Sequence, residues 1–483
     1  MNTNRIQTSA SPKPALMSEG ASLGLERQGS SVSKASALKQ RAEVALVWAV
    51  ILGPLVVTTV RQEWRIEFLA FLALTAAVLA LRHLRQLRQL MRSTWLVWCG
   101  IGGLTLWIVL ETQFTPSGPS FLYEAKAAVA LVVTLVAFAL IPVVNRDGSR
   151  DHVIERAVTA AEFFIIVQLF VSFFFGIGEH YGYRSGAVRA FGFLGDSISP
   201  ILGFFVLKHA LDRRPVRCFL SAFALAIAGG MMALAITVAG LIGILLLRRD
   251  FWRPMRNGFV AILLAQLALQ LGFALELPPN KFVDLYAEDP LLAEEQSFGK
   301  RIEWLVKDIV ASGSRRVLSL VAGIDIAYRH PLVGVGYLQS GKQIPVVAAR
   351  DPFGVGELMK APKVAWSKVK SVQNASLRIA AELGIVGLVL FWTVCVGMIL
   401  IFLKPLADLR RSGPEMRNML ETAAAVWVVS FILVNQTAAW MTPGHPQLTW
   451  LALCLGITAA KVLHKASAVS SEDNGAAYRR TDF

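Results

Sequence analysis

The residues best suited to chemistry gather in one polar segment, from about Leu277 to Phe391, between long apolar runs. Its first half carries two adjacent arginines, Arg315 and Arg316. Arginine stays charged, and its planar fork matches phosphate oxygens in a bidentate way. Either arginine is therefore chemically suited to bind a phosphorylated group. Lipid-headgroup binding, or pairing with acidic loop residues, is the structural alternative.

A glycine-rich turn follows the arginines, in the sequence HPLVGVGY that begins at His330. Gly334 and Gly336 permit close backbone approach or a positive φ, although a plain loop turn explains them equally well. His330 stands beside this turn and is a candidate base or substrate contact, because histidine exchanges protons near neutral pH. A solvated loop histidine is the alternative.

The segment closes with QNASLRIAAELGIVGLVLF, from Gln373. Asn374 is placed to cap the following helix or, with Gln373, to orient a substrate hydroxyl. Glu382 shares a helical face with Asn374 and approaches the membrane boundary, where an unpaired carboxylate is costly. We expect Glu382 either to pair with an arginine or to act as a base. Gln373 cannot be that base, since an amide does not titrate.

Metal-binding patterns are absent from the sequence. The predicted external loops hold no DxD pair and no cluster of histidine and carboxylate residues at ligand spacing. The cysteines lie within or at the edges of apolar runs and form no CxxC pair: Cys99, Cys218, Cys395 and Cys454. The sequence predicts a metal-independent reaction without a cofactor, and neither a zinc site nor a disulfide framework.

Together these motifs resemble the O-antigen ligase and polymerase superfamily, whose members typically carry an arginine, a PLxGVG turn and then HNxxLxxxxExGxxGLxxF. The matching positions are Pro331, Leu332, Gly334, Val335, Gly336, Asn374, Leu377, Glu382, Gly384, Gly387, Leu388 and Phe391. An upstream stretch from Arg189, RAFGFLGDSISPILGFF, is similar to the family's RxxGxFxxPNxxG segment, without its asparagine. Gln373 stands where the family has a histidine.

The resemblance implies an enzyme of surface polysaccharide biosynthesis. Such an enzyme moves a glycan from a lipid pyrophosphate carrier to a saccharide acceptor on the periplasmic face. It implies catalytic roles for Arg189, Arg315, Arg316, Gln373 and Glu382, and substrate contacts from Asn374, Gly334, Gly336 and His330. Membrane lipid and other polysaccharide-assembly proteins are expected partners. Ligase and polymerase readings both stay open, and so does the choice between Arg315 and Arg316 as the aligned arginine.

Composition places the chain in a membrane. Of its 483 residues, 55% are hydrophobic and only 17% are charged, against about 25% charged in soluble domains. The net charge of +15 comes from basic residues scattered over short loops, which follows the positive-inside rule and argues against nucleic-acid binding. Together with this composition, the family resemblance implies a location in the bacterial inner membrane.

The apolar runs predict an all-α polytopic membrane protein with about twelve transmembrane helices, one large periplasmic loop and both termini in the cytoplasm. The expected parts are a disordered tail at 1–43, a transmembrane bundle at 44–277, the periplasmic loop at 278–382, further transmembrane helices at 383–463 and a tail at 464–483. Arginines at 82–92 place that loop in the cytoplasm; a patch for lipid headgroups is the alternative.

One apolar run, Cys218–Leu247, is longer than a single span needs. Arginine-rich stretches flank it on both sides, at 213–217 and 248–256. A single crossing would export one of these flanks. Two short helices with a bend near Gly229–Gly240 keep both flanks inside, and we expect this hairpin.

A transporter or flippase of lipid-linked glycans is the main alternative. Glu162 and Lys208 lie within apolar runs, where ionisable residues often mark a transport path, although each can simply pair or snorkel. Against this alternative, the sequence shows no internal repeat of the kind common in transporters. A non-catalytic assembly partner is a third possibility, favoured by Gln373.

Overall fold

The structure is a computed structural model of the whole chain. It describes residues 40–41, 43–53, 55–56, 84–111, 141, 151–175, 181–184, 187–190, 198–274, 316–354, 366, 369, 371–411, 419–434, 447 and 450–459. The chain divides into two compact units, Met1–Leu46 and Val47–Phe483, and the second is described below. The predicted tail at 464–483, the span expected at Ile66–Leu81 and residues 275–315 lie outside the described residues. So do the predicted tail at 1–43, except for residues 40, 41 and 43, and the span expected at Ala127–Val144, except for Ile141.

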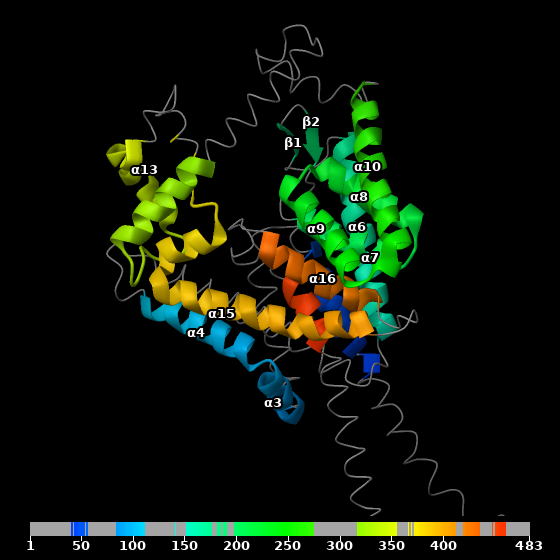
Figure 1. Cartoon of the computed structure of the whole chain (residues 1–483), viewed down its shortest axis with the longest axis horizontal. Helices are drawn as coiled ribbons and strands as arrows, with labels where there is room; N and C mark the ends of the chain where they lie inside the picture. The colour runs from blue at the N-terminus through cyan, green and yellow to red at the C-terminus, as the bar shows by residue number, and fades with distance from the viewer. Residues whose placement is uncertain are drawn as a thin grey trace, which may run out of the picture. The chain divides into compact units, whose positions relative to one another are not determined.

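Helices dominate the described residues, as the sequence predicts. They are α3 (Leu84–Ser93), α4 (Trp95–Glu111), α6 (Asp151–Phe175), α7 (Ser199–Leu211), α8 (Pro215–Ala228), α9 (Met231–Leu247), α10 (Trp252–Ala274), α13 (Ser340–Arg350), α15 (Ala375–Arg411) and α16 (Met419–Val434), with further helical stretches at 316–329 and 450–459 (Figure 1). Short 3-10 turns lie at Arg249–Phe251 and Pro352–Gly354. A small antiparallel hairpin, β1 (Tyr181–Arg184) with β2 (Ala187–Ala190), departs from the all-helical expectation.

Two of the described helices are long and apolar enough to cross a membrane, at Asp151–Phe175 and Ala375–Ala407. A third candidate is a bent pair, Leu87–Ser93 with Trp95–Glu111, whose axes meet at 94°. Shorter apolar helices include α7, α8, α9 and α16. The described part of the chain is therefore a helical membrane-type structure with two or three candidate spans.

Helix α7 is the centre of one helical group. Every residue of SPILGFFVLKHAL is buried, as expected for a helix that is apolar nearly all round. Helices α8, α9, α10 and α16 pack against it. Phe204 makes edge-to-face contacts with Trp427 and Trp450, and the Trp427 indole Nε1 donates to the Pro200 carbonyl at 2.7 Å.

The long apolar run divides at Gly229, as predicted from its arginine-rich flanks. Gly229 adopts a left-handed conformation, φ 62°, that ends α8. Helix α8 folds back on α7 after a short turn, whereas α9 runs parallel to α7. Gly230 lies beside Ser199, and Gly240 lies beside Leu207. Helices α8 and α9 therefore run in opposite directions, which returns both flanks to one end of the group.

Arginines collect at this end of the helical group. They stand in the α7–α8 and α9–α10 connections and the first turns that follow: Arg213, Arg214, Arg217, Arg248, Arg249, Arg253 and Arg256. In the α9–α10 connection, one acidic residue, Asp250, stands among these arginines. The side chain of Arg248 donates to Asp250 and lowers the pKa of that carboxyl. The end as a whole is strongly basic.

Helix α4 lies along the membrane-length part of α15 (Figure 1). Glycines let the two backbones approach: Gly100 faces Val394, and Gly397 faces Val97. Small residues serve this purpose in membrane helix pairs, where close packing drives association. Because residue numbers rise on one helix as they fall on the other, the pair is antiparallel. The Glu111 end of α4 therefore meets the start of the apolar part of α15.

Candidate functional site

Helix α15 is broken at Gly384, and the PLVGVG turn is fastened into the break. Gly384 has φ 66° and ψ −167°, far from helical values. The break leaves the preceding carbonyls without helical partners. The backbone N–H of Val335 donates to Ala381 at 3.0 Å, and that of Gly336 donates to Glu382 at 2.9 Å.

Two further contacts complete the fastening. The Trp107 indole Nε1, from α4, donates to the Leu383 carbonyl at 2.9 Å. On the other side of the break, the Ile385 N–H donates to the Pro331 carbonyl at 2.8 Å. Segments far apart in the sequence thus satisfy one another's backbone groups. The two halves of the sequence motif form a single structural unit.

Glycine is required at the points of closest approach. Gly334 has φ 81°, and a side chain there would collide with the backbone of Glu382. Gly384 is the reciprocal case, because a side chain there would collide with the Leu332 carbonyl. Gly336, with φ 107°, completes the turn. The glycine spacing on which the family resemblance depends therefore has a direct backbone reason.

Glu382 is fully buried beneath this turn. One carboxylate oxygen accepts from the Leu338 N–H at 2.8 Å, and the other accepts from the Ser340 hydroxyl at 2.5 Å and from Arg378 Nε at 2.9 Å. These three donors satisfy both carboxylate oxygens, which offsets the cost of burying the group. The Glu382 carboxylate, paired with an arginine one helical turn away, holds the start of α13 against α15.

The first turn of α15 is capped as the sequence predicts. The Asn374 side-chain oxygen accepts from the Leu377 N–H at 2.9 Å. Gln373, just before the cap, is held through its backbone, whose N–H donates to the Ser319 hydroxyl at 2.7 Å. Its side chain is exposed. Gln373 is therefore positioned by the fold while its amide faces outward.

An apolar cluster beneath the turn joins three helical segments: 316–329, α13 and the first part of α15. Its buried members are Leu318, Val321, Ala322, Ile326, Val335, Ile344, Val347, Trp366, Val369, Val372 and Ala381. Gly323 lets the first segment approach Leu377 and Val372 closely. The cluster gives the polar segment a core of its own, so the turn rests on a packed support.

A polar cavity of about 340 Å³ opens beside the turn, between the C-terminal ends of helix 316–329 and α13. Its polar lining comes from Asp325, Arg329, His330, Gln343 and Arg350. Asp325 is buried, and both its oxygens lie near Arg329 Nε, at 3.0 and 3.1 Å. Arg350 Nη1 lies 3.8 Å from the same carboxylate. One buried acid thus gathers two half-exposed guanidinium groups.

The predicted site residues fall into separate places. Gly334, Gly336, Glu382 and His330 are brought together around the turn. Arg316 is exposed at the start of helix 316–329, which is roughly 20 Å from His330 at 1.5 Å of rise per residue.

The remaining predicted residues lie elsewhere. Gln373 and Asn374 are near the Arg316 end, because Ser319 bonds to Gln373. Arg189 pairs with Gly182 through the backbone of β2. Arg315 lies outside the described residues.

Three residues of this region were not predicted from the sequence. Arg378 was predictable, because it precedes Glu382 by one helical turn and such pairs meet on a helix face. Arg329 likewise follows Asp325 at the same spacing. Arg350 carried no such signal, since only the folded turn brings α13 back to helix 316–329.

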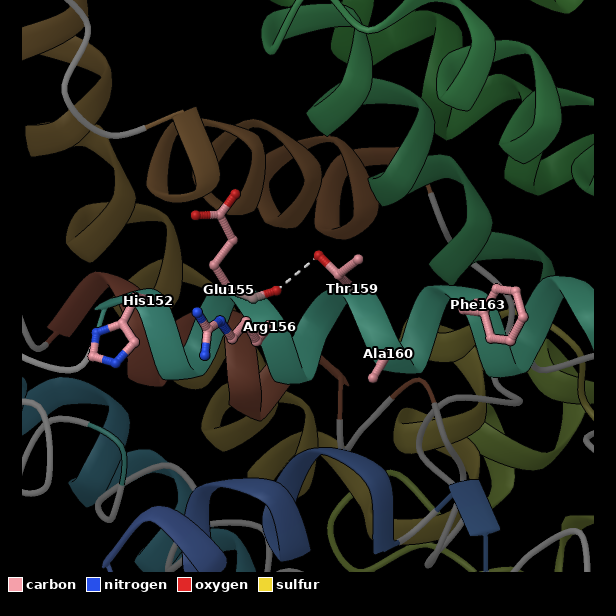
Figure 2. A pocket seen from close by; sticks show the side chains of 6 residues that line it. All are labelled: His152, Glu155, Arg156, Thr159, Ala160 and Phe163. Atoms are coloured by element: carbon pink, nitrogen blue, oxygen red, sulfur yellow. Dashed lines mark hydrogen bonds between the residues drawn. The ribbon is translucent and has the colours of Figure 1, made fainter. Parts of the chain in front are cut away.

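A larger hollow, of about 520 Å³, lies along the first half of α6 (Figure 2). The side chains of His152, Arg156 and Phe163 border it, while the Thr159 hydroxyl donates to the Glu155 carbonyl at 2.8 Å. Its described lining comes from this one helix. It gathers none of the predicted site residues, so we place the candidate site at the turn.

A buried polar network crosses the α6–α8 region. Glu162 Oε1 lies 2.6 Å from His209 Nε2 and accepts from the Ser221 hydroxyl at 2.8 Å. Lys208, almost fully buried, bonds to Asp212 at 3.1 Å and lies 4.0 Å from Glu155. Ionisable groups inside an apolar bundle are costly and often functional. Here each finds an opposite or hydrogen-bonding partner.

Comparison with known proteins gives no family assignment. No protein-family model and no curated protein sequence matches this chain. Among the residues that the structure describes, no group of three or more histidine, cysteine or acidic side chains is arranged to hold a metal ion.

Proposed function

We propose that this protein is a membrane glycosyl-transfer enzyme of surface polysaccharide biosynthesis. It moves a glycan from a lipid pyrophosphate carrier to a saccharide acceptor on the periplasmic face of the bacterial inner membrane. The observation that carries the proposal is the fastening of the PLVGVG turn into the break of α15 at Gly384. The two motif halves that resemble O-antigen ligases and polymerases act as one unit.

The position of this unit supports the proposal. The break falls near the start of the candidate span Ala375–Ala407, and in the proposed arrangement the turn stands at the membrane surface. A lipid-borne pyrophosphate lies at the same level. Outside the cytoplasm there is no ATP, so the donor must carry its own leaving group. A rigid polar platform can then position the acceptor and stabilise the departing pyrophosphate.

The directions of the helices support the proposed topology of about twelve spans with cytoplasmic termini. Antiparallel packing of α4 and α15 puts the turn at the end opposite α3. Helix α3 meets α4 at 94° and exposes Arg85, Arg88 and Arg92, as an interfacial helix on anionic headgroups would. On this view, the arginine-rich ends face the cytoplasm and the turn faces outward.

Transfer from a lipid-linked glycan by the full chain in proteoliposomes tests the proposal. Arg316→Lys keeps the charge but loses the fork, so we expect slower transfer with unchanged protein levels. Arg315→Lys is compared beside it, together with the double variant. Full polymer output from all three would refute a pyrophosphate role for this pair. The acceptor used, lipid A-core or a second lipid-linked unit, separates ligase from polymerase.

The buried Glu162–His209–Ser221 network favours one second candidate, a transporter of lipid-linked glycans. The same proteoliposomes separate the two functions. A transporter moves the labelled glycan lipid across the bilayer without forming a new glycosidic bond. A transferase forms that bond with donor and acceptor on one face. If the protein shows neither transport nor transfer, a non-catalytic assembly partner is the remaining interpretation.

A further inference from the structure

The cavity beside the turn has an unbalanced charge. Among its lining residues, two arginines accompany one acid, Asp325. Among the residues that the structure describes, that acid engages Arg329 only through Nε and Arg350 only through Nη1. The remaining guanidinium N–H groups point to no described partner. Guanidinium N–H groups that line a cavity in this way are suited to donate to the oxygens of an anion.

Burial of Asp325 explains why the two arginines stay in place. The carboxylate is 7% exposed, whereas the Arg329 and Arg350 side chains are 47% and 44% exposed. The buried Asp325 carboxylate holds one nitrogen of each guanidinium group in place. The rest of each guanidinium group stays accessible. Arginine interacts favourably with the C-terminal end of a helix, which explains why Arg329 and Arg350 each stand at such an end. The helix ends do not explain why both arginines line the same cavity.

The other polar groups fit a sugar. Gln343 provides an amide that donates and accepts, and His330 provides a ring nitrogen on the opposite segment. The volume of about 340 Å³ falls in the range of small-molecule sites, about 300–1,000 Å³. The cavity lies beside the turn, well apart from Arg316.

We propose that this cavity is an oxyanion-binding subsite that takes a carboxylate or phosphate group of a saccharide substrate. Arg329 and Arg350 hold the anion, and Gln343 and His330 contact neighbouring hydroxyls. The oxyanion belongs either to an acidic sugar of the glycan or to the phosphate that links the glycan to its carrier. The saccharide identity rests on the proposed function, whereas oxyanion binding does not.

Direct binding tests the subsite with the purified full chain in lipid nanodiscs. Sodium glucuronate, inorganic pyrophosphate and neutral glucose are titrated at constant ionic strength, with heat release as the readout. Saturable binding of glucuronate identifies an acidic sugar, and saturable binding of pyrophosphate identifies the carrier linkage. We expect no binding of glucose. If neither anion binds saturably, the subsite does not exist.

Single variants assign the binding to the arginines. Arg350→Gln is the cleaner change, because the nearest Asp325 oxygen is 3.8 Å away and the side chain is half exposed. It should weaken oxyanion binding about tenfold or more, as loss of a charged hydrogen bond does. Arg329→Gln should have a similar effect. Lys342→Gln is the matched control, since it removes a charge from an exposed position on α13 outside the cavity.

The outcomes separate this inference from the proposed function. Unchanged binding in both arginine variants, or an equal loss in Lys342→Gln, overturns the subsite. Glycan transfer without oxyanion binding would also overturn it while leaving the enzyme proposal intact. Oxyanion binding by a protein that transfers nothing would support the subsite and remove the enzyme.

Discussion

Glu382 joins three parts of the polar segment through one carboxylate. It accepts from the backbone of Leu338, the hydroxyl of Ser340 and the guanidinium of Arg378. A carboxylate so fully occupied is suited to hold structure in place, and its role in the proposed reaction is to support the turn. The burial of Arg378, 11% exposed, makes the pair sensitive to loss of either partner.

Replacing Glu382 tests this role. Glu382→Ala leaves Arg378 buried without its anion and should lower the free energy of unfolding by about 3–5 kcal/mol. Glu382→Gln should cost less, because its amide oxygen still accepts from the Leu338 N–H. Thermal unfolding of the full chain in detergent measures both. Equal stability of the alanine variant and the wild type would contradict the arrangement.

Gln373 and Asn374 are neighbours for which we predict opposite effects. Asn374→Ala removes a helix cap and should cost about 1 kcal/mol of stability. Gln373→Ala should leave stability unchanged, since the fold holds this residue through its backbone, but should weaken transfer if its amide orients the acceptor. Unfolding and transfer are measured on the same preparations. Full transfer by Gln373→Ala would remove this position from the site.

Residue-scale prediction succeeded where the signal is local. The cap at Asn374 follows from its place before a helical pattern, and the pairing of Glu382 with an arginine follows from the cost of a buried charge. The Asp325–Arg350 contact joins residues on two segments that meet only after the turn forms. Its position therefore could not be predicted by spacing alone.

At the scale of elements, the break in α15 is the feature on which the site depends. The sequence predicts that the membrane helix begins at Leu383, whereas α15 begins at Ala375. The difference has a clear cause. The residues before Gly384 are helical but belong to the polar segment, and the break separates them from the apolar part. Hydropathy therefore predicted where the apolar part of the helix begins, next to the break at Gly384, but not where the helix itself starts.

Gly384→Ala tests the fastening of the turn. A methyl group there meets the Leu332 carbonyl and requires a positive φ that alanine avoids. We expect a loss of at least about 1–3 kcal/mol of stability and faster proteolysis within 331–354. Gly102→Ala on α4 is the matched control, because nothing lies near its added methyl. It should be neutral or slightly stabilising. Similar behaviour of the two variants would contradict the fastening.

Helix order along the chain was largely predictable, and helix contacts were not. Apolar runs predicted a bundle of helices over 44–277, and arginine flanks predicted the division of one run into α8 and α9, which falls at Gly229. The contact of Trp107 with Leu383 joins residues that are 276 positions apart in the sequence, and no local pattern indicates it. The hairpin at Tyr181–Arg184 and Ala187–Ala190 was also missed, because four-residue strands leave little periodicity to detect.

For the whole molecule, charge and packing agree on one point, that the two arginine-rich connections belong together on one side. The positive-inside rule uses only sequence, and it places the arginine-rich connections in the cytoplasm. Packing uses only contacts, and it shows that both connections, at 212–214 and 248–251, lie at one end of the α7–α10 group. The proposed site requires Lys342, on α13, to lie on the other side of the membrane from Arg253.

Single-cysteine labelling measures these two positions without truncating the bundle. The four native cysteines, one exposed and three buried, are first replaced by alanine, and transfer or oxyanion binding is checked. Lys342→Cys and Arg253→Cys then place a thiol at exposed positions on α13 and at the start of α10. Intact cells with a permeable outer membrane are treated with a membrane-impermeant maleimide, before and after lysis.

We expect the Lys342→Cys thiol to react in intact cells and the Arg253→Cys thiol to react only after lysis. The reason is electrostatic, because seven arginines at one end of the α7–α10 group resist export across a membrane that is negative inside. A Lys342→Cys thiol protected until lysis would place the turn and its cavity in the cytoplasm. A reaction using a lipid-linked donor on the periplasmic face would then be impossible for this site.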